Sequence, residues 1–211
     1  MVDEVDVSGR RVRNRDAEGI CEMPDIVSDR LVLRTMGATV LRAIAGDDLQ
    51  TATKELGLAL PQEMLGPEAG MTTHFAAMHE ENPDFLAWGP RAMATKQDGL
   101  VIGHIGFHTT PDPEYLHEFV DEGIELGYTV FAGHRRQGYA SEAIKALIGW
   151  AYRSQGIENF VISVATGNVP SIALAEKLGF VTIGKYEDPD DGPEHVMRLP
   201  MTRLASLLAS D

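Results

Sequence analysis

The second half of the chain alternates between helix-like and strand-like patterns, and this alternation limits the folds open to it. One apolar stripe repeats at helical spacing and consists of Ala140, Ala143, Ile144, Leu147, Ile148 and Ala151. Gly156 suits the end of that helix, and a second helix is expected between Asn168, a good N-terminal cap, and Gly179, a good terminator. Strand-like runs lie at 160–164, 181–186 and 195–199. Helices that alternate with strands predict an α/β fold, with helices on both faces of a mixed sheet.

The first half of the chain supplies the other predicted strands. Leu31 and Leu33 alternate as in a half-buried strand. The runs 85–95 and 100–108 flank a turn that ends in Asp-Gly, which predicts a hairpin. The run 124–130 is the fourth strand, and 160–164 therefore becomes the fifth. Helical spacing is also present over 40–44, 49–58 and 71–78.

Residues 1–25 mix acids and arginines with little apolar content, which predicts a flexible tail before a single domain over 26–211. No apolar run approaches the ~18 residues of a membrane helix. The acidic start, Met1 to Asp6, differs from the basic and then apolar start of a secretory signal. We therefore expect a cytoplasmic protein.

The charge balance narrows the partners of this chain. Lys and Arg number 18 against 32 Asp and Glu, for a formal net charge of −14. Such a surface repels nucleic-acid phosphates and attracts cations, including protonated amines. Cys21 is the only cysteine, which excludes an intrachain disulfide and a cysteine-rich zinc site. Neither nucleic acid nor membrane is expected as a partner, whereas a cationic substrate is compatible with the charge.

The segment 125–140 reads as a strand, a short loop and the start of the long helix. The loop carries Arg135 and Arg136, and small residues, Gly138 and Ala140, mark the helix start. Unpaired N–H groups at a helix N-terminus, together with two guanidinium groups, form a suitable site for a pyrophosphate. The alternative is a helix end with two solvated arginines.

Several motifs of the chain resemble those of the GCN5-related N-acetyltransferases, the GNAT superfamily. Arg-Arg-Gln-Gly-Tyr-Ala at 135–140 resembles their acetyl-CoA signature, Arg/Gln-x-x-Gly-x-Gly/Ala. Glu-Leu-Gly-Tyr at 125–128 and the first strand at 28–34 resemble the branch that includes ribosomal-protein N-terminal acetyltransferases. Asn-Val-Pro-Ser at 168–171 and Ala-Glu-Lys-Leu-Gly-Phe at 175–180 resemble the family's following helix and strand.

This resemblance implies a particular fold. It implies a mostly antiparallel central sheet with helices on both faces and a V-shaped splay between the fourth and fifth strands. The resemblance is strong over 123–187, weaker over 28–108 and absent over 1–25. The chain departs from the family at Gly133, where proline is common, and in the acidic loop 109–122.

The resemblance also implies acetyl-CoA as co-substrate, with no metal. Backbone groups of Tyr128, Thr129 and Val130 would bind the pantetheine arm as an added strand, and Asn168 would hydrogen-bond it. The Val130 N–H would stabilise the oxyanion that forms on the thioester carbonyl. The pyrophosphate would be held by Arg135, Arg136, Gln137, Gly138, Tyr139 and Ala140.

The reaction needs a neutral amine, and most amines are protonated at pH 7. Glu125 lies upstream of Tyr128 on the slot strand and is the first candidate for the general base, directly or through a water. Its alternative is an exposed or salt-bridged strand carboxylate. Ser171 is the candidate proton donor or stabiliser for the departing thiolate, with Tyr186 in reserve, although Ser171 could equally be a capping residue.

We therefore expect an N-acetyltransferase that moves acetyl from acetyl-CoA to a primary amine by direct attack in a ternary complex. The acceptor is either a protein N-terminus or a small molecule, and the acids of the loop 109–122 could guide it. The alternative is an acyl-CoA-binding sensor or pseudoenzyme with the same fold and no turnover. A homodimer is the default assembly among soluble homo-oligomers.

Two other signals point to different chemistry. The run 179–186 nearly matches a P-loop, but Tyr186 replaces the Mg²⁺-binding hydroxyl and the segment reads as a strand. His104 and His108 share one strand face and could chelate a metal. Because no third ligand is evident, paired surface or slot histidines are the simpler interpretation.

Overall fold

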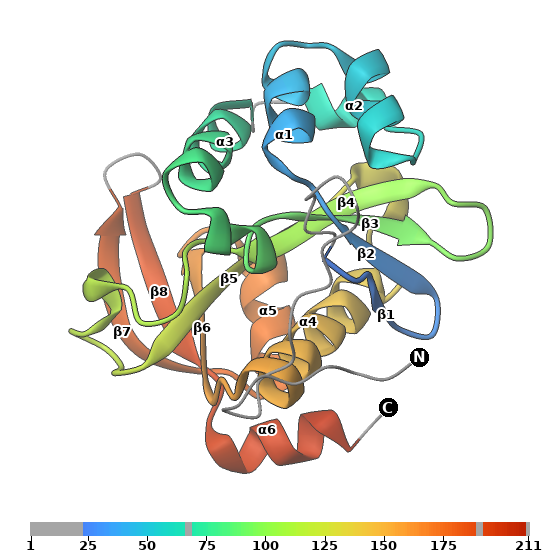
Figure 1. The fold of residues 1–211 in the computed structure, drawn as a ribbon. Helices are drawn as coiled ribbons and strands as arrows, with labels where there is room; N and C mark the ends of the chain where they lie inside the picture. Colours follow the sequence, from blue (N-terminus) through green and yellow to red (C-terminus); the bar gives the residue numbers. More distant parts are fainter. Residues whose placement is uncertain (1–22, 66–68, 189–191, 210–211) are drawn as a thin grey trace, which may run out of the picture.

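A computed structural model describes residues 23–65, 69–188 and 192–209 (Figure 1). Eight strands form one open sheet in the order β1-β2-β3-β4-β5-β6-β8-β7. Every neighbouring pair is antiparallel except β5 and β6, which are parallel. The strands are β1 Ile26–Val27, β2 Leu31–Thr35, β3 Arg91–Thr95, β4 Val101–Phe107, β5 Gly123–Val130, β6 Asn159–Ala165, β7 Val181–Asp188 and β8 Gly192–Arg198. The mostly antiparallel α/β sheet expected from the sequence is confirmed.

Helices cover both faces of this sheet (Figure 1). One layer contains α1, α2 and α3, and the opposite layer contains α4, α5 and α6. Their bounds are α1 Ala38–Ala45, α2 Leu49–Leu56, α3 Ala69–Glu81, α4 Tyr139–Gln155, α5 Val169–Leu178 and α6 Met201–Leu208. The predicted tail lies, up to residue 22, outside the described residues. Asp25, its last residue, already bonds Arg34 at 2.8 Å.

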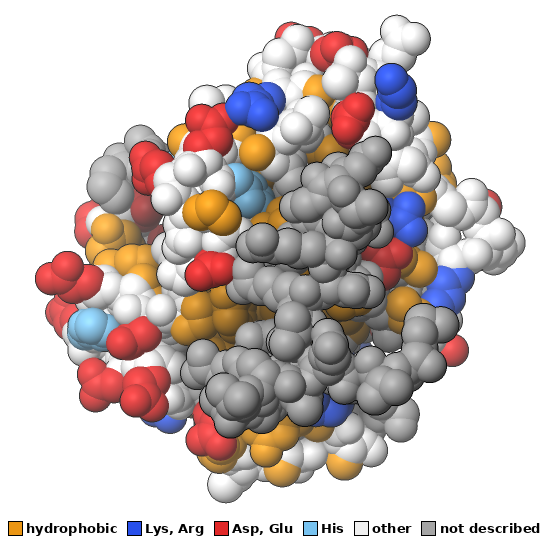
Figure 2. Space-filling model, viewed as in Figure 1, with side chains coloured by type: hydrophobic (Ala, Val, Ile, Leu, Met, Phe, Trp, Pro, Cys, Tyr) orange, Lys and Arg blue, Asp and Glu red, His pale blue; other side chains and the backbone are white. Residues whose placement is uncertain are grey.

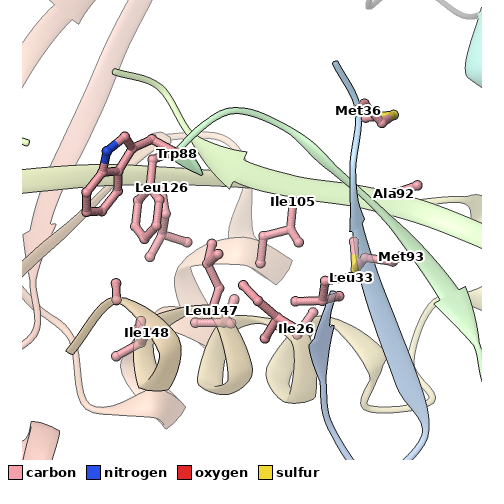
Figure 3. Close-up of a cluster of buried hydrophobic side chains, with 14 of the residues drawn as sticks. Ile26, Leu33, Met36, Trp88, Ala92, Met93, Ile105, Leu126, Leu147 and Ile148 are labelled. Carbon is pink, nitrogen blue, oxygen red and sulfur yellow. The ribbon is translucent and has the colours of Figure 1, made fainter. Parts of the chain in front are cut away.

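The apolar stripe of α4 packs against the sheet, as its spacing predicts. Ile144, Leu147 and Ile148 are fully buried. Figure 3 shows Leu147 and Ile148 pointing toward the sheet, where Leu126 and Ile105 face them. Gly156 ends α4 with a φ of +73°, a left-handed conformation that glycine adopts without strain. This packing fixes the helix start, and therefore the preceding loop, against the end of β5.

The strand predicted over 85–95 is shorter than expected. Only Arg91–Thr95 is a strand, and Pro83–Ala87 forms a 3-10 helix. The Asn82 side chain accepts the N–H of Asp84 and Pro83 occupies the first helical turn, so local capping overrides the extended pattern. The hairpin of β3 and β4 is confirmed, with its turn between Thr95 and Leu100.

Strands β5 and β6 pair only at their beginnings. Their parallel ladder joins Gly123 to Asn159, Ile124 to Phe160 and Glu125 to Val161, and it stops there. On its other side β5 continues to pair with β4 as far as Val130. The splay expected between the fourth and fifth strands is therefore present between β5 and β6.

Gly106 on β4 lets the backbone of Gly89 and Pro90 approach more closely than any residue with a side chain would allow. A Cβ built there lies 2.7 Å from Gly89 O and 2.7 Å from Pro90 Cα, both backbone atoms. We expect Gly106→Ala to lower the free energy of unfolding by about 1–3 kcal/mol, the usual cost of overpacking. Gly167→Ala is the matched control, because a Cβ there meets nothing within 4 Å. Denaturant melts check both variants, and equal midpoints would contradict the packing.

Candidate active site

The splay between β5 and β6 opens into a cleft of about 420 Å³. Strands β4, β5, β6 and β8, helix α5 and helix α3 all contribute to its walls. Its polar lining consists of His104, His108, Tyr128, Thr129, Ser163, Asn168, Ser171 and Glu194. The cleft therefore brings together three residues expected from the sequence to bind cofactor, Tyr128, Thr129 and Asn168, and one expected to be catalytic, Ser171.

The strand register determines which backbone groups face this cleft. Phe131 N donates to Ile102 O and His108 N donates to Glu125 O, so the odd-numbered residues of β5 bond to β4. The N–H and C=O groups of Tyr128 and Val130 therefore point to the side that β6 has left. Val130 O accepts a hydrogen bond of 2.8 Å from Arg135 Nε. An extended ligand could pair with β5 here as an added strand.

Glu125 sits at the apex of the splay and is only 5% exposed. Its Oε1 accepts from Ser163 N at 3.2 Å, so the carboxylate replaces the strand partner that Ser163 loses where the ladder stops. Its Oε2 accepts from the Tyr115 hydroxyl at 2.8 Å. Burial opposes ionisation, yet His108, Ser163 and Tyr115 outweigh it and hold the pKa of Glu125 at about 2. Of the two alternatives to a base, the exposed carboxylate is wrong and the ion-pair partner is present.

The partner in that ion pair is His108, whose Nδ1 lies 3.6 Å from Glu125 Oε2. The sequence placed His108 and His104 on one strand face, which the register confirms, since they lie opposite Glu125 and Thr129. Among the described residues, no group of three or more His, Cys, Asp or Glu side chains could hold a metal ion. The sequence analysis missed the pairing of His108 with Glu125. The alternation of side chains along two adjacent antiparallel strands places these two residues on the same face and could have suggested it.

Ser171 and Tyr128 meet on the α5 side of the sheet. The Tyr128 hydroxyl donates to Ser171 Oγ at 3.2 Å, and burial raises the pKa of Tyr128. Asn168 caps α5 by accepting Ser171 N at 3.3 Å, which leaves its amide NH₂ to donate to a ligand. Tyr186 is 41% exposed and does not line the cleft, so the structure does not bring it to Ser171. The sequence had held Tyr186 in reserve for the role of Ser171, whereas the tyrosine that lies beside Ser171 is Tyr128.

The loop between β5 and α4 is exposed and shaped by left-handed residues. Arg135, Arg136 and Gln137 are exposed. Arg136 has a φ of +61°, and Gly138, at the N-cap of α4, has a φ of +85°. Within the described part of the chain no side chain caps α4, which leaves its first N–H groups available to a ligand. The loop has the exposure and the charge that the phosphate site requires.

A further arginine, Arg30, holds the start of β2 against this helix end. Its backbone N and its Nε both donate to Glu142, at 2.6 and 2.7 Å. Its Nη1 donates to Gln137 O at 3.1 Å, and its guanidinium lies 4.5 Å from the Tyr139 ring centroid. Arg30 therefore fixes the orientation of the loop, a role that the sequence did not reveal because its partners lie more than a hundred residues away.

Acidic side chains gather over the loop 109–122, beside β7 (Figure 2). This loop is anchored by a second small core of Leu116, Val120, Val161 and Val196, with Phe119 packed against it. Phe119 also lies against Gly184 of β7. The loop is therefore packed against β6 and β8 of the sheet, and its Tyr115 reaches Glu125.

The family model for the acetyltransferase (GNAT) domain matches residues 10–181. The chain belongs to the GNAT acetyltransferases. This GNAT protein is similar to the uncharacterized N-acetyltransferase YoaA of Bacillus subtilis, at 28% identity over 161 residues that span 74% of this chain and 82% of the relative. It is an acyltransferase by family, and among the described residues no helix combines the length and apolar character needed to cross a bilayer.

Solved GNAT structures share this fold. An acetyltransferase from Agrobacterium tumefaciens has a TM-score of 0.57 at 25% identity, over 84% of this chain and 94% of that one. The ribosomal-protein-S5-alanine acetyltransferase from Vibrio fischeri has a TM-score of 0.55 at 14% identity, over 83% and 96% of the two chains. At such identities the likeness supports the fold of the GNAT protein and does not identify its acceptor.

Proposed function

We propose that this GNAT protein transfers an acetyl group from acetyl-CoA to a primary amine by direct attack within the β5–β6 cleft. The observation that carries the proposal is the position of the cleft. One of its faces carries Ser171, and its other face carries His108, the ion-pair partner of Glu125; the loop of Arg135 and Arg136 follows the end of the cleft-lining strand β5. Cofactor and amine can therefore approach the same point from opposite sides of the sheet.

On the cofactor side, the loop and the open start of α4 hold the diphosphate, because exposed N–H groups and guanidinium groups bind such anions. Arg135 uses Nε to bond Val130 O, which leaves its two Nη nitrogens to donate to the diphosphate. The groups of Tyr128 and Val130 that face the cleft pair with the pantetheine arm, and the Asn168 NH₂ donates to it. The Val130 N–H then lies at the thioester carbonyl and stabilises the oxyanion.

On the acceptor side, the wall is acidic. Glu194 lines the cleft, Glu125 bonds the cleft-lining Ser163, and further acids lie on the loop 109–122 beside β7 (Figure 2). Such a field concentrates protonated amines near the cleft. The acceptor class is therefore a cationic amine, either a protein N-terminus or a small molecule. The pair of His108 and Glu125 supplies the route for the proton that this amine must lose.

The test mixes the protein with acetyl-CoA, a panel of amines and a thiol reagent. The panel includes an Ala- and a Ser-initiated peptide, a diamine and a polyamine. The proposal predicts amine-dependent release of CoA thiol and an acetylated product of matching mass. CoA binding without release for every amine would favour a sensor with the same fold and would contradict the transferase.

Ser171→Ala is expected to lower kcat about tenfold and to leave the KM for acetyl-CoA within twofold. The Ser171 hydroxyl receives the Tyr128 hydrogen bond, so its own proton can go to the departing thiolate. The expected loss is smaller than the roughly 10²–10⁴-fold that is typical of acid catalysis, because water can also supply this proton. Steady-state kinetics check this, with Ser206→Ala on α6 as the matched control outside the cleft. If Ser171 only caps α5, its backbone N–H suffices for the bond to Asn168, and kcat stays unchanged.

A further inference from the structure

Glu125 is enclosed by groups that already use both of its oxygens. Ser163 N bonds Oε1, the Tyr115 hydroxyl bonds Oε2, and His108 Nδ1 lies 3.6 Å from Oε2. With 5% of the residue exposed, an amine in the cleft has little access to either oxygen. A carboxylate whose pKa is held at about 2 is also a weak acceptor for the proton of an amine, whose pKa is near 8 for an α-amino group.

His108 lies between this carboxylate and the cleft. Its side chain is 42% exposed, and it is among the residues that line the cleft. Its Nδ1 is directed at Glu125. Its Nε2 lies over Gly127, where a Cβ would come within 2.3 Å of it. Gly127 also lines the cleft, so the imidazole occupies space that only a glycine leaves free, and the nitrogen remote from Glu125 lies beside this cleft-lining residue.

We propose that His108 is the catalytic base of this site, and that Glu125, itself held by Tyr115 and Ser163, positions the imidazole. The proposal rests on the proposed function and goes beyond it by naming the atom that takes the proton. Glu125 then plays the part that a carboxylate plays toward a catalytic histidine elsewhere, since it fixes the ring and favours the Nδ1–H tautomer. Glu125 is thus a positioning residue, whose effect on the reaction passes through His108.

The step balances as follows. The nitrogen lone pair of the neutral amine forms a bond to the thioester carbonyl carbon, and one N–H proton passes to His108 Nε2. The C–S bond then breaks, and the CoA thiolate takes a proton either from Ser171, which regains one from solvent, or directly from water. The imidazolium finally returns its proton to solvent. Amine and acetyl-CoA become amide and CoA thiol, with no net gain or loss of protons.

The charged groups around His108 favour this role. Burial works against a charged ring, but Glu125 on β5 and Glu194 on β8 outweigh it and raise the pKa of His108 above its ordinary value. Other titratable groups on this side are His104, which lines the same cleft, and Tyr115, which stays neutral at physiological pH because burial and Glu125 raise its pKa. The pKa of His108 is closer to that of an amine than the pKa of Glu125 is, so His108 is the better proton acceptor. Because the imidazole accepts a proton only when it is neutral, kcat should rise as the pH passes through the pKa of His108.

The experiment measures kcat against pH at saturating acetyl-CoA, with the amine that the wild type turns over fastest. We expect His108→Gln to lose about a hundredfold in kcat and to lose the rising limb, with the KM for acetyl-CoA within twofold. We expect Glu125→Gln to keep a rising limb that moves to lower pH, because the pKa of His108 falls without the carboxylate. A purely structural role would lower kcat by the same factor at every pH.

The matched control is His117→Gln. His117 forms an imidazole–carboxylate pair of its own, with Nε2 2.9 Å from Asp112 Oδ1, on the loop 109–122 and outside the cleft lining. Its profile should equal that of the wild type. Gly127→Ala is the second variant, because its Cβ displaces the His108 ring while His108 and Glu125 both stay in the sequence. It should lower kcat at least tenfold with unchanged acetyl-CoA binding.

The outcomes distinguish a failure of the role of His108 from a failure of the acetyltransferase activity itself. A wild-type profile in His108→Gln, with turnover intact, overturns the role of His108 and leaves the acetyltransferase standing. Retained acetyl-CoA binding without turnover of any amine by the wild type overturns both. NMR titration of the imidazole adds a reading free of turnover, with a midpoint above 6.5 in the wild type that falls in Glu125→Gln; an unchanged midpoint overturns the pairing.

Discussion

Replacing Arg135 and Arg136 together by alanine is expected to raise the KM for acetyl-CoA about a hundredfold or more, with kcat nearly unchanged. Both side chains are exposed at the open start of α4, where the account places the diphosphate. Hydrogen bonds to a charged group contribute about 1.5–3 kcal/mol each, so the loss of two corresponds to at least two orders of magnitude in binding. Initial rates at varied acetyl-CoA, with the amine held saturating, give the KM.

The matched control removes the same two charges elsewhere. Arg42 lies on α1 and forms an exposed ion pair with Glu80, and Arg203 is exposed on α6. Their double alanine variant should bind acetyl-CoA like the wild type, since neither residue adjoins the loop. An equal rise in KM in both double variants would mean that overall charge, and not the loop, attracts the cofactor.

Replacing Val130 by proline is expected to lower kcat by about two to three orders of magnitude, the usual effect of losing an oxyanion donor. The register of β4 and β5 directs the Val130 N–H into the cleft, so proline removes the proposed donor without breaking a ladder bond. Val130 is the last residue of β5, and Thr129 before it is already extended, as a residue before proline prefers.

Thermal melts and kinetics together test this variant. Val130→Pro should melt close to the wild type, whereas Thr129→Pro should be clearly less stable, because odd-numbered residues of β5 bond to β4. Turnover by a folded Val130→Pro at the wild-type rate would remove the Val130 N–H from the reaction. Comparable instability of both proline variants would show that the register does not leave this group unpaired.

Local signals account for the parts of the fold that the sequence predicted well. The helices α4 and α5 follow an apolar stripe or a capping pair, with Gly156 and Gly179 at their ends, both in the left-handed conformation. The hairpin of β3 and β4 follows from its Asp-Gly turn. Such signals act within a few residues, so they can be recognised without knowledge of the fold. The start of β3 was predicted too early, because Asn82 caps a 3-10 helix in the segment that was predicted to be a strand.

The chemistry of the site depends on contacts that no local signal records. Glu125 was predicted as the general base, but the structure buries it, and its partner Tyr115 comes from the loop 109–122, which packs against β7. The partnership with His108 depends on the register of two strands, and the bond from Tyr128 to Ser171 depends on where α5 lies. The candidate side chains of the site could therefore be predicted from the sequence, whereas their contact partners could be identified only once the arrangement of the sheet was known.

Calorimetric titration with coenzyme A and, separately, with pantetheine tests the central claim most directly. The two ligands share the arm that pairs with β5, and only coenzyme A carries the diphosphate that the loop 135–140 would bind. The account predicts measurable heat and a saturable isotherm for coenzyme A, with pantetheine at least a hundredfold weaker. No heat with coenzyme A, or equal dissociation constants for the two ligands, would contradict it.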